Sequence, residues 1–413
     1  MKRFNKISWK FIATSAIILV IALVVTTAIS TNRFGKAVTG FAKDDLQRTA
    51  EENAAHISKF YDDKTRLCMA LSEEDLIIQS CLDQAGTLRG NMAGPTYHNY
   101  AKDVNPARWN ELCIYLNRNW EYWQDQLENM FVGDIYGYAH CGAFEVLGIP
   151  TSGIPMNVEG RGGNYWARAI EGKIAFGDLE WSPVPTHDFL ISAIAVPVKD
   201  SSGRVCGIAA VAIDSRPVMS YIQRNAVGST GFTVLLDRYG RILSHPNAEY
   251  CLHGLPDDGS LTETYLKDLS GSGWADLQEN MLALEDGYAT VTQGGKKYQV
   301  YYQSVDPVGQ YAGMGLSVAS VISDSELHEE ANSMRNTIVI IAVIAILVAV
   351  VLCYWVARMI TKPMKDLQDA ADKISKGDMD VAINIKSKDE VGDLAESFNR
   401  MVQAVKYLMQ DKD

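Results

Sequence analysis

Asp214 is the residue of this chain with the strongest case for chemistry. The eight residues before it, Cys206–Ile213, are all apolar or glycine, so the carboxylate at the end of this run must meet a partner or solvent. Small-molecule sites combine aromatic walls with a few polar anchors. Side chains of both kinds precede Asp214, namely Tyr136, Tyr138, His140, Tyr165, Trp166 and Trp181. The mixture predicts a binding pocket within residues 130–215. Core packing is the alternative for each aromatic residue, and a turn or helix-cap role before Ser215 is the alternative for Asp214.

The sequence has none of the spacings that mark common catalytic sites. It contains no glycine-rich phosphate loop, no Gly-x-Ser-x-Gly run and no His-Glu-x-x-His run. No His and Cys spacing indicates zinc. The formal net charge of −12, without a basic stripe in the polar part of the chain, argues against nucleic-acid binding. We therefore expect no enzyme activity, no cofactor and no metal.

The cysteines leave two interpretations open. Cys353 lies in an apolar run near the C-terminus. The other six are Cys68, Cys81, Cys113, Cys141, Cys206 and Cys251. An even number permits disulfides in an oxidising compartment. The spacings are irregular and none is Cys-x-x-Cys, so the sequence favours mostly buried thiols over a complete set of disulfides.

A long helix is expected to precede the candidate site. Apolar residues, from Phe41 and Leu46 to Leu67 and Leu71, recur at helical spacing through residues 33–83, and no proline interrupts them. Residues 106–128 form a second helical stretch that is rich in aromatic side chains.

Strands are expected after these helices. Ile191–Val198 and Val205–Ile213 are apolar and flank the turn signal Asp200-Ser-Ser-Gly203, which predicts a hairpin. Further strands are expected at 231–237, 241–245, 298–305 and 313–321. The order predicts an α+β fold, in which a long stalk helix carries two modules built on antiparallel sheets.

Two apolar runs bracket these modules. Phe11–Ile29 and, roughly, Thr337–Val356 contain no charged residue, and about 20 residues suffice for a helix to cross a bilayer core. Basic residues lie at their outer ends: Lys2, Arg3, Lys6, Lys10, Arg358, Lys362 and Lys365. Because basic flanks favour the cytoplasmic side, we expect both termini to be cytoplasmic and residues 32–336 external. A cleaved signal peptide is the alternative for the first run.

The residues after the second run carry two amphipathic stripes. Apolar side chains spaced 4, 3, 4 and 3 residues apart run from Ile360 to Ile374 and from Leu394 to Leu408, the pattern of helices that pack together. Two short helices cannot bury such stripes alone, so we expect a homodimer that forms a parallel four-helix bundle. Its expected core contains Ile374, Leu394, Phe398 and Met401.

Three further residues fit this arrangement of two helices. Pro363 is near the start of the first helix, where a missing N–H costs little. Asp389 and Glu390 open the second helix, where acids complement the helix dipole.

The hairpin segments resemble the double Cache sensor domains of bacterial receptors. Ile191–Asp214 and Gly231–Pro246 carry this resemblance, and Gly163–Ala169 is similar to the helix that covers the distal pocket in that family. The resemblance implies two PAS-like modules on the stalk helix, a distal one at 85–218 and a proximal one at 219–322. It also implies that a small molecule binds to the distal module.

The resemblance supplies part of the ligand site. Amino-acid-binding members use an Arg-x-Trp-Tyr run, a Tyr-x-Asp pair and an aspartate at a strand end. Tyr165 and Trp166 stand where the aromatic pair falls, and Asp214 stands where the strand-end acid falls. Gly163 replaces the arginine, and Trp181-Ser-Pro183 replaces the Tyr-x-Asp pair.

A guanidinium would then have to come from another arginine, and Arg161 and Arg168 are the candidates. The implied ligand is an amino acid, a carboxylate or an amine. The candidate ligand-binding set is Tyr136, Tyr138, His140, Arg161, Tyr165, Trp166, Trp181 and Asp214.

The C-terminal stripes resemble a HAMP domain, through Pro363 and the run Asp389-Glu-Val-Gly392. Together the two resemblances imply a sensor with two spans in the bacterial plasma membrane. The implied division is 1–10 cytoplasmic, 11–31 first span, 32–336 external, 337–357 second span and 358–411 HAMP domain. Its implied partners are a second copy, membrane lipid and a cytoplasmic kinase, phosphatase or chemotaxis protein.

Two other classes remain open. The chain could be an anchored external protein that delivers a solute, or an anchored external enzyme. The ordered stripes favour the sensor, because an anchor needs no signal converter.

Overall fold

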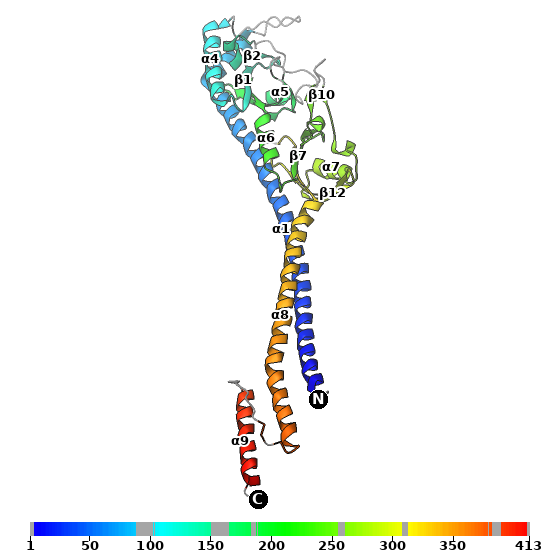
Figure 1. Cartoon of the computed structure of the whole chain (residues 1–413). Coiled ribbons are helices and arrows are strands. Elements are labelled where there is room, and N and C mark those ends of the chain that lie inside the picture. Colours follow the sequence, from blue (N-terminus) through cyan, green and yellow to red (C-terminus); the bar gives the residue numbers. More distant parts are fainter. Residues whose placement is uncertain are drawn as a thin grey trace. The chain divides into compact units, whose positions relative to one another are not determined.

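The computed structural model describes residues 4–87, 102, 104–149, 165–182, 187, 189–254, 261–307, 313–378, 380–381 and 390–410. These residues belong to two compact units. One unit is Gly40–His328, and the other combines Met1–Thr39 with Glu329–Asp413. Figure 1 shows the helices and strands of both and labels some of them.

The stalk helix, α1 (Phe4–Ser72), ends earlier than expected. The prediction of one helix through residue 83 is wrong, because the chain turns at Glu73 and Glu74 and α2 (Asp75–Thr87) follows. Asp75 lies in the first turn of α2, where an acid complements the helix dipole. The signal for this break was therefore present in the sequence.

The distal module is built on an antiparallel sheet with the strand order β2-β1-β6-β5-β3, and β4 also pairs with β5. Its strands are β1 (Leu127–Gly133), β2 (Ala139–Gly142), β3 (Ala175–Phe176), β4 (Glu180–Trp181), β5 (Leu190–Lys199) and β6 (Val205–Asp214). The predicted β5–β6 hairpin is confirmed. The helix expected over 106–128 is shorter, since α4 (Pro106–Trp123) ends before Leu127 begins β1.

Two hydrophobic clusters occupy the distal module. The larger cluster joins apolar side chains of α1, α2 and α4 to those of the sheet, among them Ile57, Leu116 and Val211. The other cluster lies beneath α5 (Tyr165–Ile170) and includes Phe131 and Ala212. Helices therefore cover the distal sheet in two places.

The proximal module follows through α6 (Arg216–Arg224), a short helix between the two sheets. Its sheet has the order β11-β12-β13-β7-β8 and is covered by α7 (Trp274–Leu282). The strands are β7 (Phe232–Leu236), β8 (Ile242–Ser244), β11 (Gly287–Gln293), β12 (Lys296–Ser304) and β13 (Ser317–Ser323), with the small pair β9 (His253–Gly254) and β10 (Leu261–Thr262) apart. The two-module α+β fold of the expectation is confirmed.

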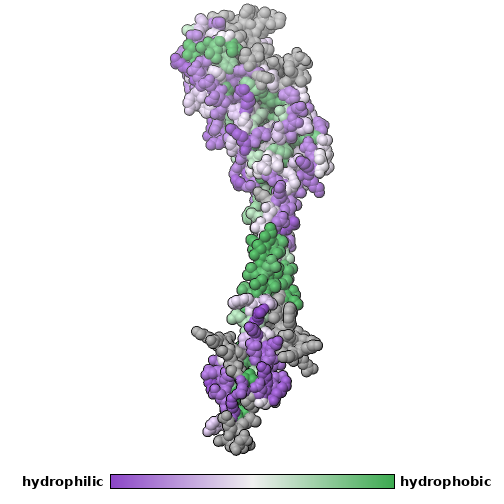
Figure 2. All heavy atoms as spheres, viewed as in Figure 1, coloured by the Kyte–Doolittle hydropathy of each residue, from purple (hydrophilic) through white to green (hydrophobic). Residues whose placement is uncertain are grey.

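The second unit contains α8 (Asp324–Ile374) and α9 (Glu390–Gln410). In the described part of the chain, α8 is the helix whose length and apolar composition suit a membrane crossing, and Ile17–Arg33 is a shorter apolar stretch. Figure 2 shows the hydrophobic residues of this unit gathered in one band. A second span over 11–31 remains a prediction.

Pro363 does not begin a new helix, contrary to the expectation. It lies inside α8, which continues through the proline to Ile374. An internal proline removes one backbone hydrogen bond but does not by itself end a long helix. α8 ends where the first predicted stripe ends, because turns follow Ile374 and Gly377 adopts a φ of 93°. α9 begins at Glu390 as expected, and Asp389 lies outside the described residues.

Candidate functional site

The aromatic pair of α5 is packed into the distal module. Tyr165 and Trp166 are buried, and Trp166 is 1% exposed. They lie among small side chains of the sheet, including Ala193 and Ala212. The ring of Trp166 lies directly against Gly133, where an added Cβ would come within 1.8 Å of a ring carbon. Both residues are thus core residues of this fold, and their contact with a ligand stays a prediction.

Asp214 has a partner close by in the sequence. It ends β6, is buried, and its carboxylate accepts hydrogen bonds from the backbone N–H of Arg216 at 2.9 Å and from Nη2 of Arg216 at 2.7 Å. Because α6 begins at Arg216, Asp214 also has the turn or cap role that was its alternative. The spacing Asp-x-Arg in the sequence is a signal for this pair, although Arg216 is not among the predicted site residues.

Arg216 is held from two sides. Its guanidinium carbon lies 3.7 Å from the ring centre of Phe189, in a cation–π contact, while Asp214 holds its edge. Its side chain is nevertheless 61% exposed. An arginine that is fixed in position and open to solvent is suited to binding a carboxylate, since its planar fork offers paired donors.

A second acid lies deeper, beside Asp214. Glu128, in β1, is buried, accepts a hydrogen bond from the Ser182 hydroxyl, and has Oε1 3.0 Å from Nδ1 of His187. Burial raises the pKa of Glu128, and the hydrogen bond from Ser182 and the contact with His187 oppose this effect. The ring of His187 stacks on Phe189 with the centroids 5.0 Å apart. The ends of β1 and β6 thereby share one polar cluster.

The other predicted residues do not form one pocket with this cluster. Tyr136 and Tyr138 are in the turn between β1 and β2, where their N–H groups bind Oδ1 of Asp134 at 2.7 and 3.0 Å. Trp181 is half-buried in β4 opposite Leu190. Arg161 lies outside the described residues.

Arg168, the other candidate for the guanidinium, lies on α5. It donates a hydrogen bond to the backbone carbonyl of Phe176, in β3. In the described structure it therefore supports a strand of the distal sheet.

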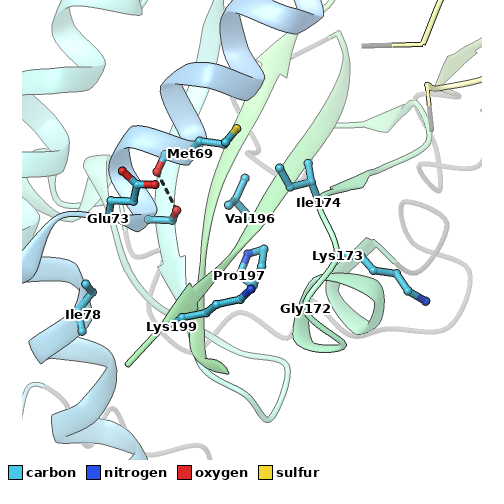
Figure 3. A pocket seen from close by; sticks show the side chains of 10 residues that line it. Met69, Glu73, Ile78, Gly172, Lys173, Ile174, Val196, Pro197 and Lys199 are labelled. Carbon is cyan, nitrogen blue, oxygen red and sulfur yellow. Dashed lines mark hydrogen bonds between the residues drawn. The ribbon is translucent and has the colours of Figure 1, made fainter. Parts of the chain in front are cut away.

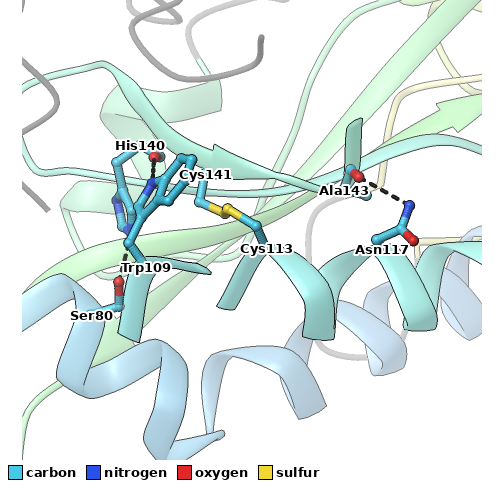
Figure 4. The surroundings of a disulfide bond; sticks show 7 residues. All are labelled: Ser80, Trp109, Cys113, Asn117, His140, Cys141 and Ala143. Carbon is cyan, nitrogen blue, oxygen red and sulfur yellow. Dashed lines mark hydrogen bonds between the residues drawn. A yellow bond between two sulfur atoms is a disulfide. The ribbon is translucent and has the colours of Figure 1, made fainter. Parts of the chain in front are cut away.

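His140 belongs to a different part of the module (Figure 4). It is fully buried in β2, with Nε2 3.3 Å from the hydroxyl of Ser80 in α2, and its carbonyl accepts a hydrogen bond from Trp109 in α4 at 2.9 Å. Burial lowers the pKa of His140 to about 3, so its ring is neutral at physiological pH. These contacts place His140 against α2 and α4, and not in the hydrophobic cluster beneath α5.

The disulfide of Figure 4 joins Cys113 of α4 to Cys141 of β2, with the Cα atoms 6.0 Å apart. Cys68, Cys81 and Cys206 are free and buried, and Cys251 is free and half-buried. The expectation of mostly buried thiols thus holds for three of the six cysteines before residue 300, and one pair is oxidised.

A cavity of about 780 Å³ opens elsewhere on the distal module (Figure 3). It lies between the end of α1, the start of α2 and the edge of β5. Its floor is apolar, with charged side chains at the rim. The lining includes Met69, Glu73, Ile174, Val196, Pro197 and Lys199. None of the predicted ligand residues lines it.

Comparison with known families identifies both parts of the chain. Residues 36–331 match the Cache domain and residues 355–406 match the HAMP domain. The methyl-accepting chemotaxis protein TlpB of Bacillus subtilis is 26% identical over 61% of this chain and 34% of its own length. The methyl-accepting chemotaxis protein PctB of Pseudomonas aeruginosa is 24% identical over 68% of this chain and 42% of its own length.

Among solved structures, the ligand-binding domain of PctB in complex with L-Arg is 15% identical, with a TM-score of 0.41 over 68% of this chain and 95% of that domain. The chain spans well under half the length of the curated relatives it matches. Its Cache match covers most of its residues, including both sheets and the part of α1 from residue 36 onward. The chain therefore belongs to the Cache domain family.

Proposed function

We propose that this chain is a transmembrane receptor of the bacterial plasma membrane, which binds a small molecule in its distal module and passes the signal to its HAMP domain. The observation that carries the proposal is the succession of a Cache domain, one long apolar helix and a HAMP domain in one polypeptide. Both termini would be cytoplasmic and residues 32–336 external. Its relatives bear the name chemotaxis protein, so a chemotaxis partner is the first output to test, with a kinase or phosphatase as the others.

The proposed ligand carries a carboxylate, as an amino acid does. Arg216 supports this choice, because Asp214 and Phe189 hold its guanidinium in place while much of it stays exposed. The buried carboxylate of Glu128 supplies negative charge nearby, which would favour an ammonium group on the same ligand. Trp166 and Asp214 remain the proposed contacts from the sequence.

The proposed signal leaves the site through α6. Arg216 begins this helix next to the site, and its far end is tied to the stalk, where Asn225 donates a hydrogen bond to Asn53 of α1 at 2.9 Å. In the middle of α6, the ring of Tyr221 stacks on His56 of α1, with centroids 3.5 Å apart. A displacement at the start of α6 would therefore move α6 as a rigid body and pass to the stalk helix α1.

The segment after α6 reaches the output helix. The N–H groups of Ser229 and Thr230 donate to the carboxylate of Glu326 at 2.7 and 2.9 Å, and both hydroxyls donate to it as well. Glu326 lies in the first turn of α8. This clamp joins the segment between the two modules to the helix that is proposed to cross the membrane.

The HAMP domain is proposed to act as a homodimer. Within one chain, Leu367, Ala370, Ala395 and Val402 are buried, whereas Leu394 and Met401 of the predicted core are each about half exposed. Phe398 and Ile374 are intermediate. A second copy that completes a four-helix bundle would cover the exposed part of the stripe, as the 4-3 spacing requires.

Ligand binding is tested with the full chain in detergent, by thermal shift against amino acids, other carboxylates and amines. A ligand at 100 times its Kd should add about 2.7 kcal/mol to the free energy of unfolding. Arg216→Gln should weaken a carboxylate ligand about 10-fold to 100-fold, because a charged hydrogen bond is lost. Asp214→Ala should abolish the shift.

Arg204→Gln is the matched control, since Arg204 also pairs with an aspartate, Asp200, in the same module. It should bind as the wild type does. Equal loss in both arginine variants would reject the site, and an unchanged affinity of Arg216→Gln would remove Arg216 from it. Lys199→Gln tests the cavity of Figure 3 as the alternative location.

The relay is tested in membranes with a cysteine at Met401. Ligand should change the rate of cross-linking between two copies of Met401→Cys, and Glu326→Ala should abolish that change while leaving ligand affinity intact. Glu329→Ala, on the next turn of α8, is the control. Arg400→Cys should cross-link less than Met401→Cys, and equal cross-linking at both positions would reject the ordered bundle. An anchored solute-binding protein would bind ligand without any change in cross-linking.

A further inference from the structure

Two free cysteines meet in the core of the distal module. Cys81, in α2, is 1% exposed and Cys206, in β6, is 5% exposed. Both belong to the hydrophobic cluster that α1, α2 and α4 form with the sheet. They lie far apart in the sequence, so the packing of α2 against β6 alone brings them together.

A local irregularity of β6 turns Cys206 toward α2. Val198 pairs with Gly207 and Lys199 pairs with Val205, so Cys206 is the extra residue of a bulge. The glycine that follows it allows close approach. A Cβ added at Gly207 would lie 2.4 Å from Sγ and 3.0 Å from Cβ of Cys81. The side chain of Cys81 therefore rests on the backbone next to Cys206.

The two thiols also affect each other's titration. The thiol of Cys81 forms a hydrogen bond with Cys206, and this contact together with burial raises the pKa of Cys81. The same hydrogen bond lowers the pKa of Cys206. Cys206 is thus the better nucleophile of the pair, because the thiolate is the reactive form.

We propose that Cys81 and Cys206 form a second disulfide of the distal module, in addition to the bond between Cys113 and Cys141. The oxidant is a disulfide-bearing molecule such as oxidised glutathione. Sγ of Cys206 also donates to the carbonyl of Val198 at 3.5 Å, and the other free external thiols contact carbonyl groups as well. Cys68 lies 3.1 Å from the carbonyl of Ala209, and Cys251 lies 3.6 Å from that of His245.

The reaction proceeds as a thiol–disulfide exchange. The thiolate of Cys206 attacks one sulfur of the oxidant, which forms a mixed disulfide and releases one thiol. The thiolate of Cys81 then attacks the sulfur of Cys206 and displaces the second thiol. The two cysteines lose two protons and two electrons, and the oxidant takes them up as two thiols.

This bond would lock α2 onto β6, the strand that ends at Asp214. The existing disulfide ties α4 to β2 in the same module. Because the new bond closes a loop that includes α4, β1 and β5, it would restrict the unfolded chain over a long stretch. Oxidation would therefore stabilise the strand next to the proposed ligand site.

The test uses the full chain in membranes, incubated with oxidised glutathione. Free thiols are alkylated after denaturation, and the digested protein is analysed by mass spectrometry. We expect a linked peptide that contains Cys81 and Cys206. The bond between Cys113 and Cys141 is the internal control for oxidising conditions. Alkylation of both Cys81 and Cys206 in chains in which the control pair is linked would overturn the proposal.

Two variants sharpen the assignment. Cys81→Ala should leave Cys206 free to be alkylated, whereas Cys68→Ala should leave the linked peptide unchanged. A linked peptide that joins Cys206 to another cysteine in the wild type would overturn the pairing. If Cys81→Ala does not fold, the measurement on the wild-type chain decides alone.

Discussion

The distal and proximal modules contain the same hairpin turn with different side chains. In the distal turn, the N–H groups of Tyr136 and Tyr138 bind Oδ1 of Asp134. In the proximal turn, the N–H groups of Tyr239 and Arg241 bind Oδ1 of Asp237 at 3.0 and 2.9 Å. A positive-φ glycine lies between the two donors in each, with φ of 101° at residue 137 and 83° at residue 240. The backbone geometry is thus shared.

The residue after the glycine distinguishes the two turns. Arg241 places Nε 2.6 Å from the carboxylate of Asp237, and both side chains are buried. Tyr138 takes this place in the distal turn, so the buried Asp134 has no arginine at that position, and burial raises its pKa to about 6. The proximal turn thus pairs its buried acid with an arginine, whereas a tyrosine stands at that place in the distal turn.

The position of the proximal turn explains why its acid and arginine are buried. Arg238 and Tyr239 both contact the carboxylate of Asp178, in the distal module, at 2.9 Å. Nη2 of Arg241 lies 3.5 Å from the carbonyl of Leu179. The proximal turn is therefore also a contact between the two modules, and this contact buries its acid and its arginine.

The largest effect is expected from Arg241→Met. Removal of the arginine leaves Asp237 buried without its cation, which should cost about 3–5 kcal/mol in the free energy of unfolding. Arg204→Met, at the equivalent place in the exposed turn of Asp200, should cost far less because surface ion pairs contribute little. The free energies of unfolding of the two variants are compared by denaturant titration, with tryptophan fluorescence as the signal. Equal losses of stability in the two variants would contradict the expectation that the buried ion pair matters more than the exposed one.

A smaller effect, with a definite sign, is expected at Asp134. Its pKa rises from 3.8 in the unfolded chain to about 6 in the fold, so the native state binds more protons between these values. Stability should therefore fall as the pH rises from about 4 to 6, by about 3 kcal/mol in total.

Asp134→Asn tests this dependence, because the amide oxygen can still accept both N–H groups of the turn but cannot ionise. The variant should lose this part of the pH dependence in thermal unfolding measured at pH 4, 5, 6 and 7. A wild-type stability that rises over this range with an unchanged slope in the variant would refute the assignment.

The smallest effects are expected at the turn glycines. Gly203→Ala places a side chain in open space at a φ of 80°, so only backbone strain of about 1–2 kcal/mol is expected. Gly240→Ala adds a close approach, because its Cβ would lie 2.7 Å from Nε2 of the buried Gln278. It should be the more destabilising of the two in the same unfolding assay. The reverse order would show that Gln278 moves aside without loss.

Local chemistry made much of the architecture predictable. The turn at Asp200-Ser-Ser-Gly203 and the one through Gly240 were found because aspartate and glycine act within five residues of backbone. The stripes of Ile360–Ile374 and Leu394–Leu408 follow from helical periodicity for the same reason. The break of α1 at Glu73 was equally local, although only the structure drew attention to it.

Tertiary structure alone decided how the site residues are grouped. Burial is a property of the packed chain, so no spacing could place His140 against α2 or Glu128 beside His187. The meeting of Cys81 and Cys206 has the same origin, since a bulge and a glycine in β6 set their approach. The sequence by itself determined which elements form and which residues could do chemistry. The fold determined which of those residues meet, because long-range packing positions them.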